Sequence, residues 1–573
     1  MNRRQFIKYA GKGLVSLLIG GSSLAAASKL QKPRPNVLFL ALDDLNDWVG
    51  CLKGHPDVKT PNIDRLAKRG VLFTNAQCTS PICGPSRSAV LTGMRPETTG
   101  VYHNQPGKYK HYVPDAVAFP KHFRDNGYHV MGGGKINHGL GEHEPENWDE
   151  YGPDCGIVGA PFTHDEIKCE GMTPEGREVV RNGKVICRLP MNGGISMIDR
   201  PTNQWDTFDW GGLPLPDDEF PAVNLADWAV KKLKDRHKKP FFLGVGLFKP
   251  HQPFFLPESY FRMYDPMKIH LPQTIAGDLE DVPEAGKAYA QVAWSSGTHS
   301  TVVKQNQWRQ AVAAYLATIT FADAQIGKVI DALDSSDFAE NTWIVLWSDH
   351  GWTLGEKSHW GKQDLWRGSG HIPLIIVPPK NALPKGFKPG MRCNAPVNLL
   401  DLYPTLIDLC ELPERSELEG QSLLPLVRDP DAKWSEATVM TVGRGSHAVC
   451  DRHWRYIHYY DGSEELYDHR VDPEEWFNLA DDEKYADVKG RLSQHLVQDK
   501  RIYQYVRWGR YKAIFMKDGS VMLFDMRGLF GISEQFDLAK QLPEVVAAIK
   551  SYLWQHKLTD RHVIMPVIKE NNE

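Results

Sequence analysis

Two pairs of potential metal ligands, Asp43-Asp44 and Asp349-His350, are the first residues in this sequence that could do chemistry. Adjacent carboxylates repel each other, so burying such a pair without a counter-charge is unfavourable. A divalent cation removes that repulsion, and Asp349-His350 from a distant part of the chain can complete its coordination. Oxygen-rich ligation favours Ca²⁺ or Mg²⁺ over zinc, although one imidazole blurs that choice, and we predict Ca²⁺ with Mg²⁺ as the second choice. Helix capping is a common role for one aspartate, but it explains two such pairs poorly.

Several short apolar runs are predicted to be buried strands, and polar residues that could take part in catalysis or binding follow them. These runs are residues 37–42, 128–131, 241–248, 342–347 and 372–377. Nearly continuous apolar runs are typical of parallel strands that are covered on both faces. Four of the five runs lead into Asp, Lys or His. Because ligands bind beyond the carboxyl ends of parallel strands, the sequence predicts one active site at that edge.

Helical patterns lie between the predicted strands. Thr60-Pro61 provides an N-cap and a first-turn proline for a helix that ends at Gly70. A longer helix is predicted over about 308–333, where apolar residues recur at spacings of three and four. Strands that alternate with helices predict a doubly wound α/β domain, which we assign to residues 33–434.

From about residue 435 the pattern of the sequence changes and two similar segments occur. We predict a smaller α+β domain over 435–573. Asp461-Gly462-Ser463 and Phe477-Asn478-Leu479-Ala480 recur as Asp518-Gly519-Ser520 and Phe536-Asp537-Leu538-Ala539. Each copy reads as a hairpin followed by a helix, which favours a duplicated unit. The alternative to duplication is chance similarity between short sequences that are common in turns.

The sharpest signal is the segment 81–93, Pro-Ile-Cys-Gly-Pro-Ser-Arg-Ser-Ala-Val-Leu-Thr-Gly. Cys83-x-Pro85-Ser86-Arg87, followed by Leu91-Thr92-Gly93, resembles the signature of the type I sulfatases, in which the cysteine becomes formylglycine. Taken alone, Cys83 would be interpreted as a buried structural thiol. Four further segments are similar to the iduronate-2-sulfatase branch of this family: Asp43 to Asp47, Gly134 to His138, Lys249-Pro250-His251 and Asp349 to Trp352. The resemblance covers roughly residues 36–480.

The resemblance implies an alkaline-phosphatase-like fold, with a mostly parallel sheet and helices on both faces, and an enzyme that hydrolyses sulfate esters. It implies that a maturase converts Cys83 to formylglycine, whose hydrate is polarised by the cation and Arg87 and attacks sulfur. The metal ligands that it implies are Asp43, Asp44, Cys83, Asp349 and His350.

The same resemblance implies roles for other side chains. Lys135 and Lys362 would neutralise the sulfate oxygens, His251 would protonate the leaving alcohol, and His138 would assist the hydrate. Without the motifs, a single Lys or His at these positions would be interpreted as a surface group. Trp352, His103 and Asn104 are weaker candidates for the substrate rim, since a tryptophan after a strand more often serves in packing.

The first 27 residues resemble a bacterial Tat export signal. Arg3-Arg4 precedes a mildly apolar stretch, residues 13–24, and Ala25-Ala26-Ala27 provides a cleavage site. A basic amphipathic helix is the alternative. The signal predicts a periplasmic or secreted protein. No run of 18 apolar residues predicts a membrane span. The 67 basic and 71 acidic residues leave no basic excess of the kind that binds nucleic acid.

Export permits disulfides, but the nine cysteines are an odd number, so at least one is unpaired or modified. We predict a pair between Cys169 and Cys187 that closes a surface loop. No CxxC framework is present, so structural zinc is not expected.

Three functions are compatible with these features. The first is a sulfatase acting on a sulfated carbohydrate. The second is a phosphonate or phosphate-ester hydrolase, because such relatives can share the Cys-x-Pro-x-Arg motif. The third is an exported glycan-binding protein without catalysis, and the complete set of candidate site residues argues against it.

Overall fold

The computed structural model describes residues 34–573 except 105–108, 139–143, 157–158, 170–176, 195–207, 292–296, 528–533, 535 and 567–573. The predicted export signal, residues 1–27, lies outside the described residues. Pro35–Glu573 forms one compact unit, and the predicted domain boundary at residue 435 falls inside it. Among the described residues, none of the helices combines the length and the apolar character that crossing a bilayer requires.

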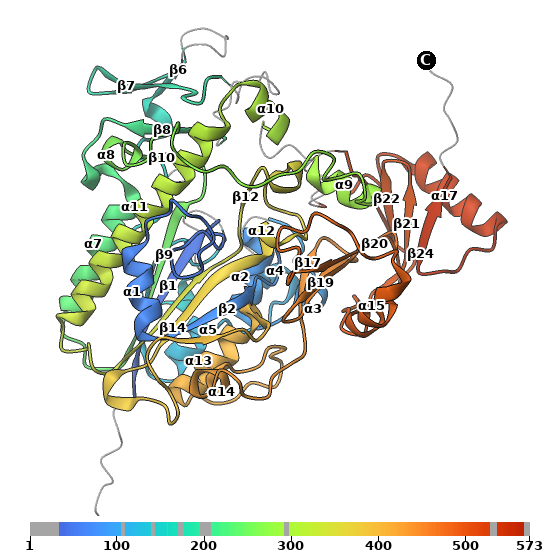
Figure 1. Cartoon of the computed structure of the whole chain (residues 1–573). Coiled ribbons are helices and arrows are strands. Elements are labelled where there is room, and N and C mark those ends of the chain that lie inside the picture. The colour runs from blue at the N-terminus through green and yellow to red at the C-terminus, as the bar shows by residue number, and fades with distance from the viewer. Residues whose placement is uncertain are drawn as a thin grey trace, which may run out of the picture. The chain divides into compact units, whose positions relative to one another are not determined.

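A mostly parallel sheet lies at the centre of the molecule (Figure 1). Its order among the described residues is β15 (Met391–Cys393), β2 (Val71–Gln77), β14 (His371–Val377), β11 (Thr342–Ser348), β1 (Asn36–Asp43), β9 (Phe241–Pro250), β3 (His129–Gly134) and β4 (Glu150–Tyr151), with β16 (Val397–Asn398) also beside β2. The predicted α/β class, with its mostly parallel sheet, is confirmed.

Strand β1 is central because it pairs in parallel with both β11 and β9. Side chains alternate along a strand, so β1 contributes Val37 and Phe39 to one core and Leu38 and Leu40 to the other. Strand β14 runs antiparallel to β11 and β2. Its first residue, His371, therefore lies at the sheet edge where the parallel strands end.

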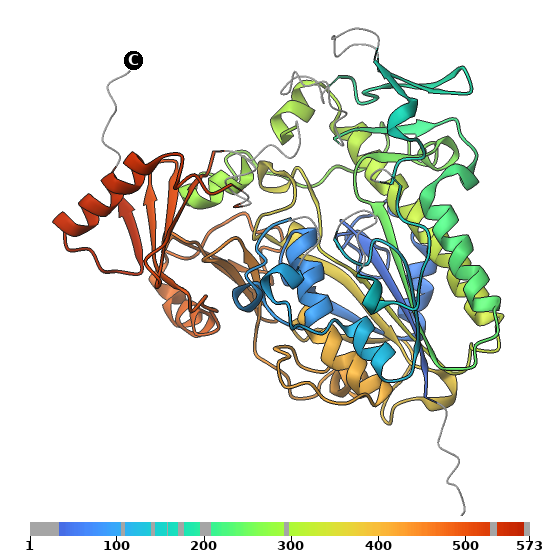
Figure 2. The ribbon, with the colours of Figure 1, turned by 180° about the vertical axis from the view of Figure 1, so that it is seen from behind.

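Helices cover both faces of the sheet (Figures 1 and 2). One core contains residues of α1 (Pro61–Arg69), α7 (Pro221–Lys234) and α11 (Trp308–Asp334), and the other contains residues of α2 (Cys83–Thr92), α5 (Phe119–Asp125) and α13 (Leu402–Cys410). The shorter α-helices are α3 (Pro96–Thr99), α4 (Tyr109–Tyr112), α8 (Glu258–Phe261), α9 (Glu284–Ala290), α10 (His299–Lys304), α12 (Arg367–Gly370) and α14 (Leu424–Arg428). Strands β8 (Trp210–Leu213) and β10 (Phe254–Pro257) pair with each other, as do β12 (Thr353–Leu354) and β13 (Trp360–Gly361).

Two four-stranded sheets form the C-terminal part of the chain; the first is antiparallel, and the second is antiparallel except that β21 and β24 pair in parallel. The first contains β17 (Thr438–Val442), β18 (Ser446–Cys450), β19 (Trp454–His458) and β20 (Glu464–Asp468), and is followed by α15 (Ala486–Ser493). The second contains β21 (Ile502–Trp508), β22 (Tyr511–Met516), β23 (Val521–Asp525) and β24 (His562–Met565), with α17 (Pro543–Gln555) before β24.

The two similar sequence segments in this region make the same local hydrogen bonds. In the turns, the Asp461 carboxylate accepts from the backbone N–H of Ser463 at 3.1 Å, and that of Asp518 accepts from Ser520 at 2.9 Å. After the hairpins, Oδ1 of Asn478 accepts the N–H groups of Leu466 and Ala480, and Oδ1 of Asp537 accepts those of Leu523 and Ala539. That the two segments arose by duplication stays a prediction.

The predicted disulfide between Cys169 and Cys187 is wrong. Cys187 is a free thiol. In the three-stranded sheet of β5 (Ile167–Cys169), β6 (Arg177–Arg181) and β7 (Lys184–Leu189), β6 separates the strands that carry the two cysteines. Neighbouring strands lie about 4.8 Å apart, so two such spacings exceed the reach of about 7 Å between the Cα atoms of a disulfide.

Candidate active site

The side chains that follow the parallel strands meet around Cys83, the first residue of α2. The Cys83 sulfur lies 3.1 Å from Nζ of Lys362, 3.2 Å from Nε2 of His350, 3.5 Å from Oδ1 of Asp43 and 3.7 Å from Nζ of Lys135. All five residues are buried. We call this group, together with Asp44, Arg87, His138, His251 and Asp349, the catalytic cluster.

Arg87 lies one helical turn after Cys83, so that α2 directs both side chains to the same place. Its Nε donates to Oδ2 of Asp349 at 2.9 Å, and its Nη2 lies 3.5 Å from Oδ1 of Asp43. Burial would lower the pKa of Arg87, but Asp349 and Asp43 raise it above its ordinary value. The guanidinium is therefore a permanent positive charge that holds two carboxylates in position.

The two predicted lysines each have a carboxylate partner. Lys362 Nζ lies 2.6 Å from Oδ1 of Asp44, and Lys135 forms an ion pair with Asp43. Burial would lower both lysine pKa values, but Asp44 raises that of Lys362 and Asp43 raises that of Lys135. Both lysines therefore stay charged although they are buried.

This concentration of positive charge stabilises an anion at position 83. Burial alone would raise the pKa of the Cys83 thiol. Lys135, Lys362 and His350 instead bring it well below its ordinary range. A tetrahedral anion bound at the same point would have the same charge partners.

Two combinations of side chains in the cluster have the spacing of metal ligands. Asp43, Cys83, Asp349 and His350 each place a ligand atom within 4.8 Å of the others, and so do Asp44, Cys83 and His251. Oδ2 of Asp44 is buried and has no hydrogen-bond partner among the described residues. Burial, together with Asp43, raises the pKa of Asp349 to about 7. A cation among these oxygens would give Oδ2 of Asp44 a partner and would stabilise the ionised form of Asp349. The residues therefore fit a metal ion.

His350 is oriented as a metal ligand requires. Its Nδ1 donates to the carbonyl oxygen of Gly351 at 3.0 Å, which leaves Nε2 directed toward Cys83 and Asp349. Burial would lower the pKa of His350, but Asp349 raises it to about 9.

Two further histidines border Cys83 and Asp44. His251 lies after β9, and its Nε2 is 3.6 Å from Oδ2 of Asp44. The side chain of His138 hydrogen-bonds that of Cys83, and burial lowers its pKa. The cluster thus offers a nucleophile position, positive charges around it and imidazoles beside it, which suits the transfer of an anionic group from an alcohol.

Some residues that position the cluster were not identified from the sequence. Asp44 has a backbone φ of 64°, an unusual conformation for a residue with a side chain. The hydroxyl of Tyr315 stabilises this turn by donating to the carbonyl of Asp44 at 2.6 Å and accepting the N–H of Asn46 at 3.2 Å. The sequence places Tyr315 only on the apolar face of a helix. A hydroxyl among otherwise apolar side chains is the one sequence feature that could have indicated its role.

The weaker substrate-rim candidates lie beside the cluster. Trp352 is fully buried, and Lys362 Nζ is 5.5 Å from the centre of its ring, so the indole supports that lysine. Asn104 accepts the N–H of Gly84 at 2.7 Å and so fixes the start of α2. Burial lowers the pKa of His103 to about 4. The predicted contacts of Trp352 and His103 with substrate stay predictions.

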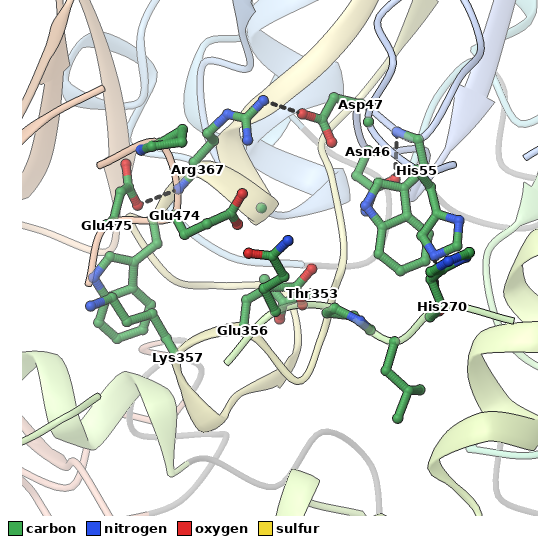
Figure 3. A pocket seen from close by; sticks show the side chains of 18 of the residues that line it. Asn46, Asp47, His55, His270, Thr353, Glu356, Lys357, Arg367, Glu474 and Glu475 are labelled. Carbon is green, nitrogen blue, oxygen red and sulfur yellow. Dashed lines mark hydrogen bonds and ion pairs between the residues drawn. The ribbon is translucent and has the colours of Figure 1, made fainter. Parts of the chain in front are cut away.

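Asn46 and Asp47, which follow Asp44 in the chain, line a separate cavity of about 340 Å³ (Figure 3). In it, Nη2 of Arg367 lies 2.5 Å from Oδ2 of Asp47, and Glu356 and Glu474 face the same space. Burial raises the pKa of Glu356 to about 7. None of the residues of the catalytic cluster lines this cavity.

Comparison with known families and proteins agrees with the motifs. The family described as Sulfatase matches residues 35–412, and the family described as N-sulphoglucosamine sulphohydrolase, C-terminal, matches residues 355–502. A protein named Sulfatase from Formosa agariphila is 36% identical over 458 residues, which are 79% of this chain and 84% of that protein. The Homo sapiens Iduronate 2-sulfatase is 30% identical over 448 residues, which are 70% of this chain and 74% of that protein.

Solved structures share the fold. A structure described as a complex with its substrate D-glucosamine-2-N,6-O-disulfate has a TM-score of 0.61 and 21% identity, and the match covers 80% of this chain and 96% of that one. A phosphonate monoester hydrolase from Silicibacter pomeroyi has a TM-score of 0.64 and 21% identity, covering 80% and 94% of the two chains.

Proposed function

The chain belongs to the sulfatase family of sulfuric ester hydrolases, and we propose that it is an exported enzyme that removes sulfate from a carbohydrate. The observation that carries this proposal is the electrostatics at position 83, where buried Lys135, Lys362 and His350 all favour a negative charge. A sulfate ester that enters such a site would have its negative charge compensated by groups that are already oriented.

We propose that the cluster holds one Ca²⁺, with Mg²⁺ as the second choice. Asp43, Asp44, Asp349, His350 and residue 83 would be its ligands. Three carboxylates and one imidazole form a ligand set rich in oxygen, which suits a hard cation. When bound, the cation would act as a Lewis acid on the sulfate oxygens and fix the orientation of residue 83.

We further propose that a maturase converts Cys83 to formylglycine. As an aldehyde hydrate, residue 83 would have two hydroxyl groups. One would attack sulfur while the sugar oxygen leaves, and deprotonation of the other would later expel sulfate and regenerate the aldehyde. The position suits this chemistry because the nucleophile would start at the N-terminus of α2, beside two lysines.

The surrounding residues would assist in distinct ways. Lys135 and Lys362 would bind sulfate oxygens and hold the charge that shifts onto them. His251 would donate a proton to the leaving sugar oxygen, and His138 would hydrogen-bond the oxygen that replaces the Cys83 sulfur. Arg87 would keep Asp43 and Asp349 oriented toward the cation.

The printed names of similar proteins support a sulfated sugar as substrate, because an iduronate sulfatase and a glucosamine-disulfate complex are among them. Residues 1–27 support export by the Tat route, which carries folded proteins and is compatible with modification of Cys83 before export. The phosphonate hydrolase structures share the fold at low identity, so phosphate-ester cleavage is the activity to test against.

The experiment compares sulfated sugars, an aryl sulfate and an aryl phosphate as substrates of protein produced with a maturase. Peptide mass determines the state of residue 83 in the same sample. We expect release of sulfate from at least one sugar, a preference for aryl sulfate over aryl phosphate, and an aldehyde at position 83. Active enzyme with an unmodified thiol would refute the mechanism, and a preference for aryl phosphate would refute the substrate class.

A further inference from the structure

A second group of basic side chains, of which His447 is buried and the others are half-buried, lies between the two C-terminal sheets around a cavity of about 220 Å³. His447 of β18, His458 of β19 and Tyr505 of β21 line it, together with Gln498, Arg561 and His562. No carboxylate belongs to its lining among the described residues. We call this cavity the histidine pocket. Figure 1 shows the strands β19, β21 and β24 that surround it.

Arg561 brings a positive charge to this pocket without a carboxylate partner. Its two terminal nitrogens donate only weakly, to the carbonyl oxygens of Ile502 and Asp499 at 3.4 Å each. The guanidinium also lies 5.6 Å from the centre of the Tyr505 ring. Within the described part of the chain, Arg561 forms no ion pair. Most buried or half-buried arginines elsewhere in this protein do have a carboxylate partner, such as Arg444 with Glu534.

The imidazoles in the pocket have unused hydrogen-bonding capacity. Nδ1 of His562 donates to the carbonyl oxygen of Tyr460 at 2.7 Å, which assigns the proton of the neutral ring to Nδ1 and leaves Nε2 able to take up a second proton. The ring of His458 lies 5.0 Å from that of His562 and makes no hydrogen bond within the described residues. His447 contacts Thr441 through Nδ1 at 3.1 Å.

Burial and mutual repulsion keep these rings uncharged. Burial, together with neighbouring histidines, lowers the pKa of His447 to about 3 and that of His458 to about 4. Arg95 and Lys512 also disfavour a charge on His447, and Arg561 disfavours one on His562. An anion in the pocket would reverse this balance by favouring the protonated rings.

The acidic residues that approach the pocket already have partners of their own. These pairs are Glu97 with Thr441 and, at 3.5 Å, with His447 of the pocket, Asp461 with Arg507, Glu464 with Lys489, Asp499 with Arg501, and Glu534 with Lys512 and Arg444. None of these carboxylates pairs with Arg561, so an anion from outside the chain would balance the charge of this guanidinium.

We propose that the histidine pocket is a second oxyanion site, which binds a sulfate group. Its basic groups come from several strands in two sheets and approach from different directions, which matches a tetrahedral anion better than a planar carboxylate. The site itself is inferred from the pocket alone, whereas the choice of sulfate over other tetrahedral anions rests on the proposed function. The sulfate can be the free ion or an ester on a glycan.

The test uses calorimetry on the full-length mature protein. A Lys362→Met variant weakens the catalytic cluster, so that binding to the histidine pocket can be measured by itself. Sodium sulfate is titrated against sodium chloride at matched ionic strength, at pH 6 and pH 8 as test conditions. Arg561→Gln and His458→Gln are then added to the Lys362→Met background. Arg527→Gln, which changes an exposed arginine in the turn after β23, is the matched control.

We expect Lys362→Met protein to bind one sulfate, more tightly at the lower pH and with proton uptake, because the imidazoles gain protons as the anion binds. Arg561→Gln should weaken this binding about tenfold, the loss expected for one charge-assisted hydrogen bond, and His458→Gln should reduce the proton uptake. Arg527→Gln should change neither. Near-ultraviolet circular dichroism checks that each variant remains folded.

Several outcomes separate the possibilities. Saturable binding of free sulfate identifies a site for the ion, and binding of a sulfated oligosaccharide but not of free sulfate identifies a site for the ester. The proposal would be overturned if neither free sulfate nor a sulfated oligosaccharide bound at pH 6. It would also be overturned if the affinity were unchanged in the Arg561→Gln and His458→Gln variants. Failure of the proposed function is distinguishable, because it appears as absent hydrolysis by the wild-type enzyme whatever the calorimetry shows.

Discussion

The buried catalytic cluster and the partly buried histidine pocket are both rich in basic groups, but they control charge in opposite ways. In the cluster, Lys362 is paired with Asp44 and Lys135 with Asp43, and the pKa of each lysine is raised despite burial. Among the described residues the lining of the histidine pocket contains no carboxylate, although Glu97 lies 3.5 Å from His447, and burial lowers the pKa of His447 and His458. Burial lowers the pKa of a basic group, and a close carboxylate such as Asp44 beside Lys362 or Asp43 beside Lys135 can reverse that effect.

This difference has a functional consequence. Lys135, Lys362 and Arg87 of the cluster stay charged at every physiological pH, as is required of groups that stabilise a developing negative charge without reorganising. The pocket gains charge only when an anion arrives or the pH falls. The first arrangement suits catalysis, and the second suits reversible binding.

The largest expected effect separates the two regions completely. Cys83→Ala removes the proposed nucleophile and should reduce turnover of a sulfated sugar by a factor on the order of 10⁴ or more. Sulfate binding in the histidine pocket should not change, because the pocket shares no residue with α2. Steady-state kinetics and calorimetry on the same preparation measure both. Turnover within tenfold of wild type would exclude residue 83 as the nucleophile.

Removal of a single carboxylate from the cluster should have the next largest effect. Asp349→Asn and Asp43→Asn should each weaken cation binding about a hundredfold or more and reduce activity with it. Elemental analysis after dialysis gives the metal content, and Asp331→Asn on the exposed face of α11 is the control. Full activity after exhaustive chelation would contradict a metal site, and zinc as the only metal found would overturn the assignment of Ca²⁺.

The proton donor can be tested through the leaving group. His251→Gln should slow the hydrolysis of a sugar sulfate by about a hundredfold, because an alkoxide is a poor leaving group without a proton. An aryl sulfate with an acidic phenol needs no such proton, so its rate should fall much less. His270→Gln, at an exposed position, should alter neither rate. Equal losses on both substrates would assign His251 to binding instead.

The smallest expected effect concerns stability in the histidine pocket. The folded pKa of His458, about 4, lies below the ordinary value of 6.5. The unfolded chain therefore binds more protons below pH 6.5, and this histidine's contribution to stability is present above that pH and is lost as the pH falls toward 4. The free energy of unfolding, measured with urea, should be lower at pH 5 than at pH 7.5, and this decrease should be about 1 kcal/mol smaller in His458→Gln than in the wild type. An identical decrease in both proteins would place this histidine in a solvated environment.

Much of the catalytic cluster could be predicted from the sequence because its signals are local. Cys83 and Arg87 stand four residues apart, which one helix turn converts into proximity. Asp43 and Asp349 each follow an apolar run, and parallel strands bring such run ends to one edge. The family and the α/β class were predicted correctly from these patterns.

The tertiary structure decided what depends on contacts between distant segments. The reversed direction of β14, the strand that separates Cys169 from Cys187, and the support of Asp44 by Tyr315 leave no periodic signal in the sequence. The histidine pocket is the clearest case, because His447, His458 and His562 are ordinary strand residues until two sheets bring them together. Sequence periodicity reports which face of an element is buried, whereas the charge of a buried group depends on neighbours that only folding supplies.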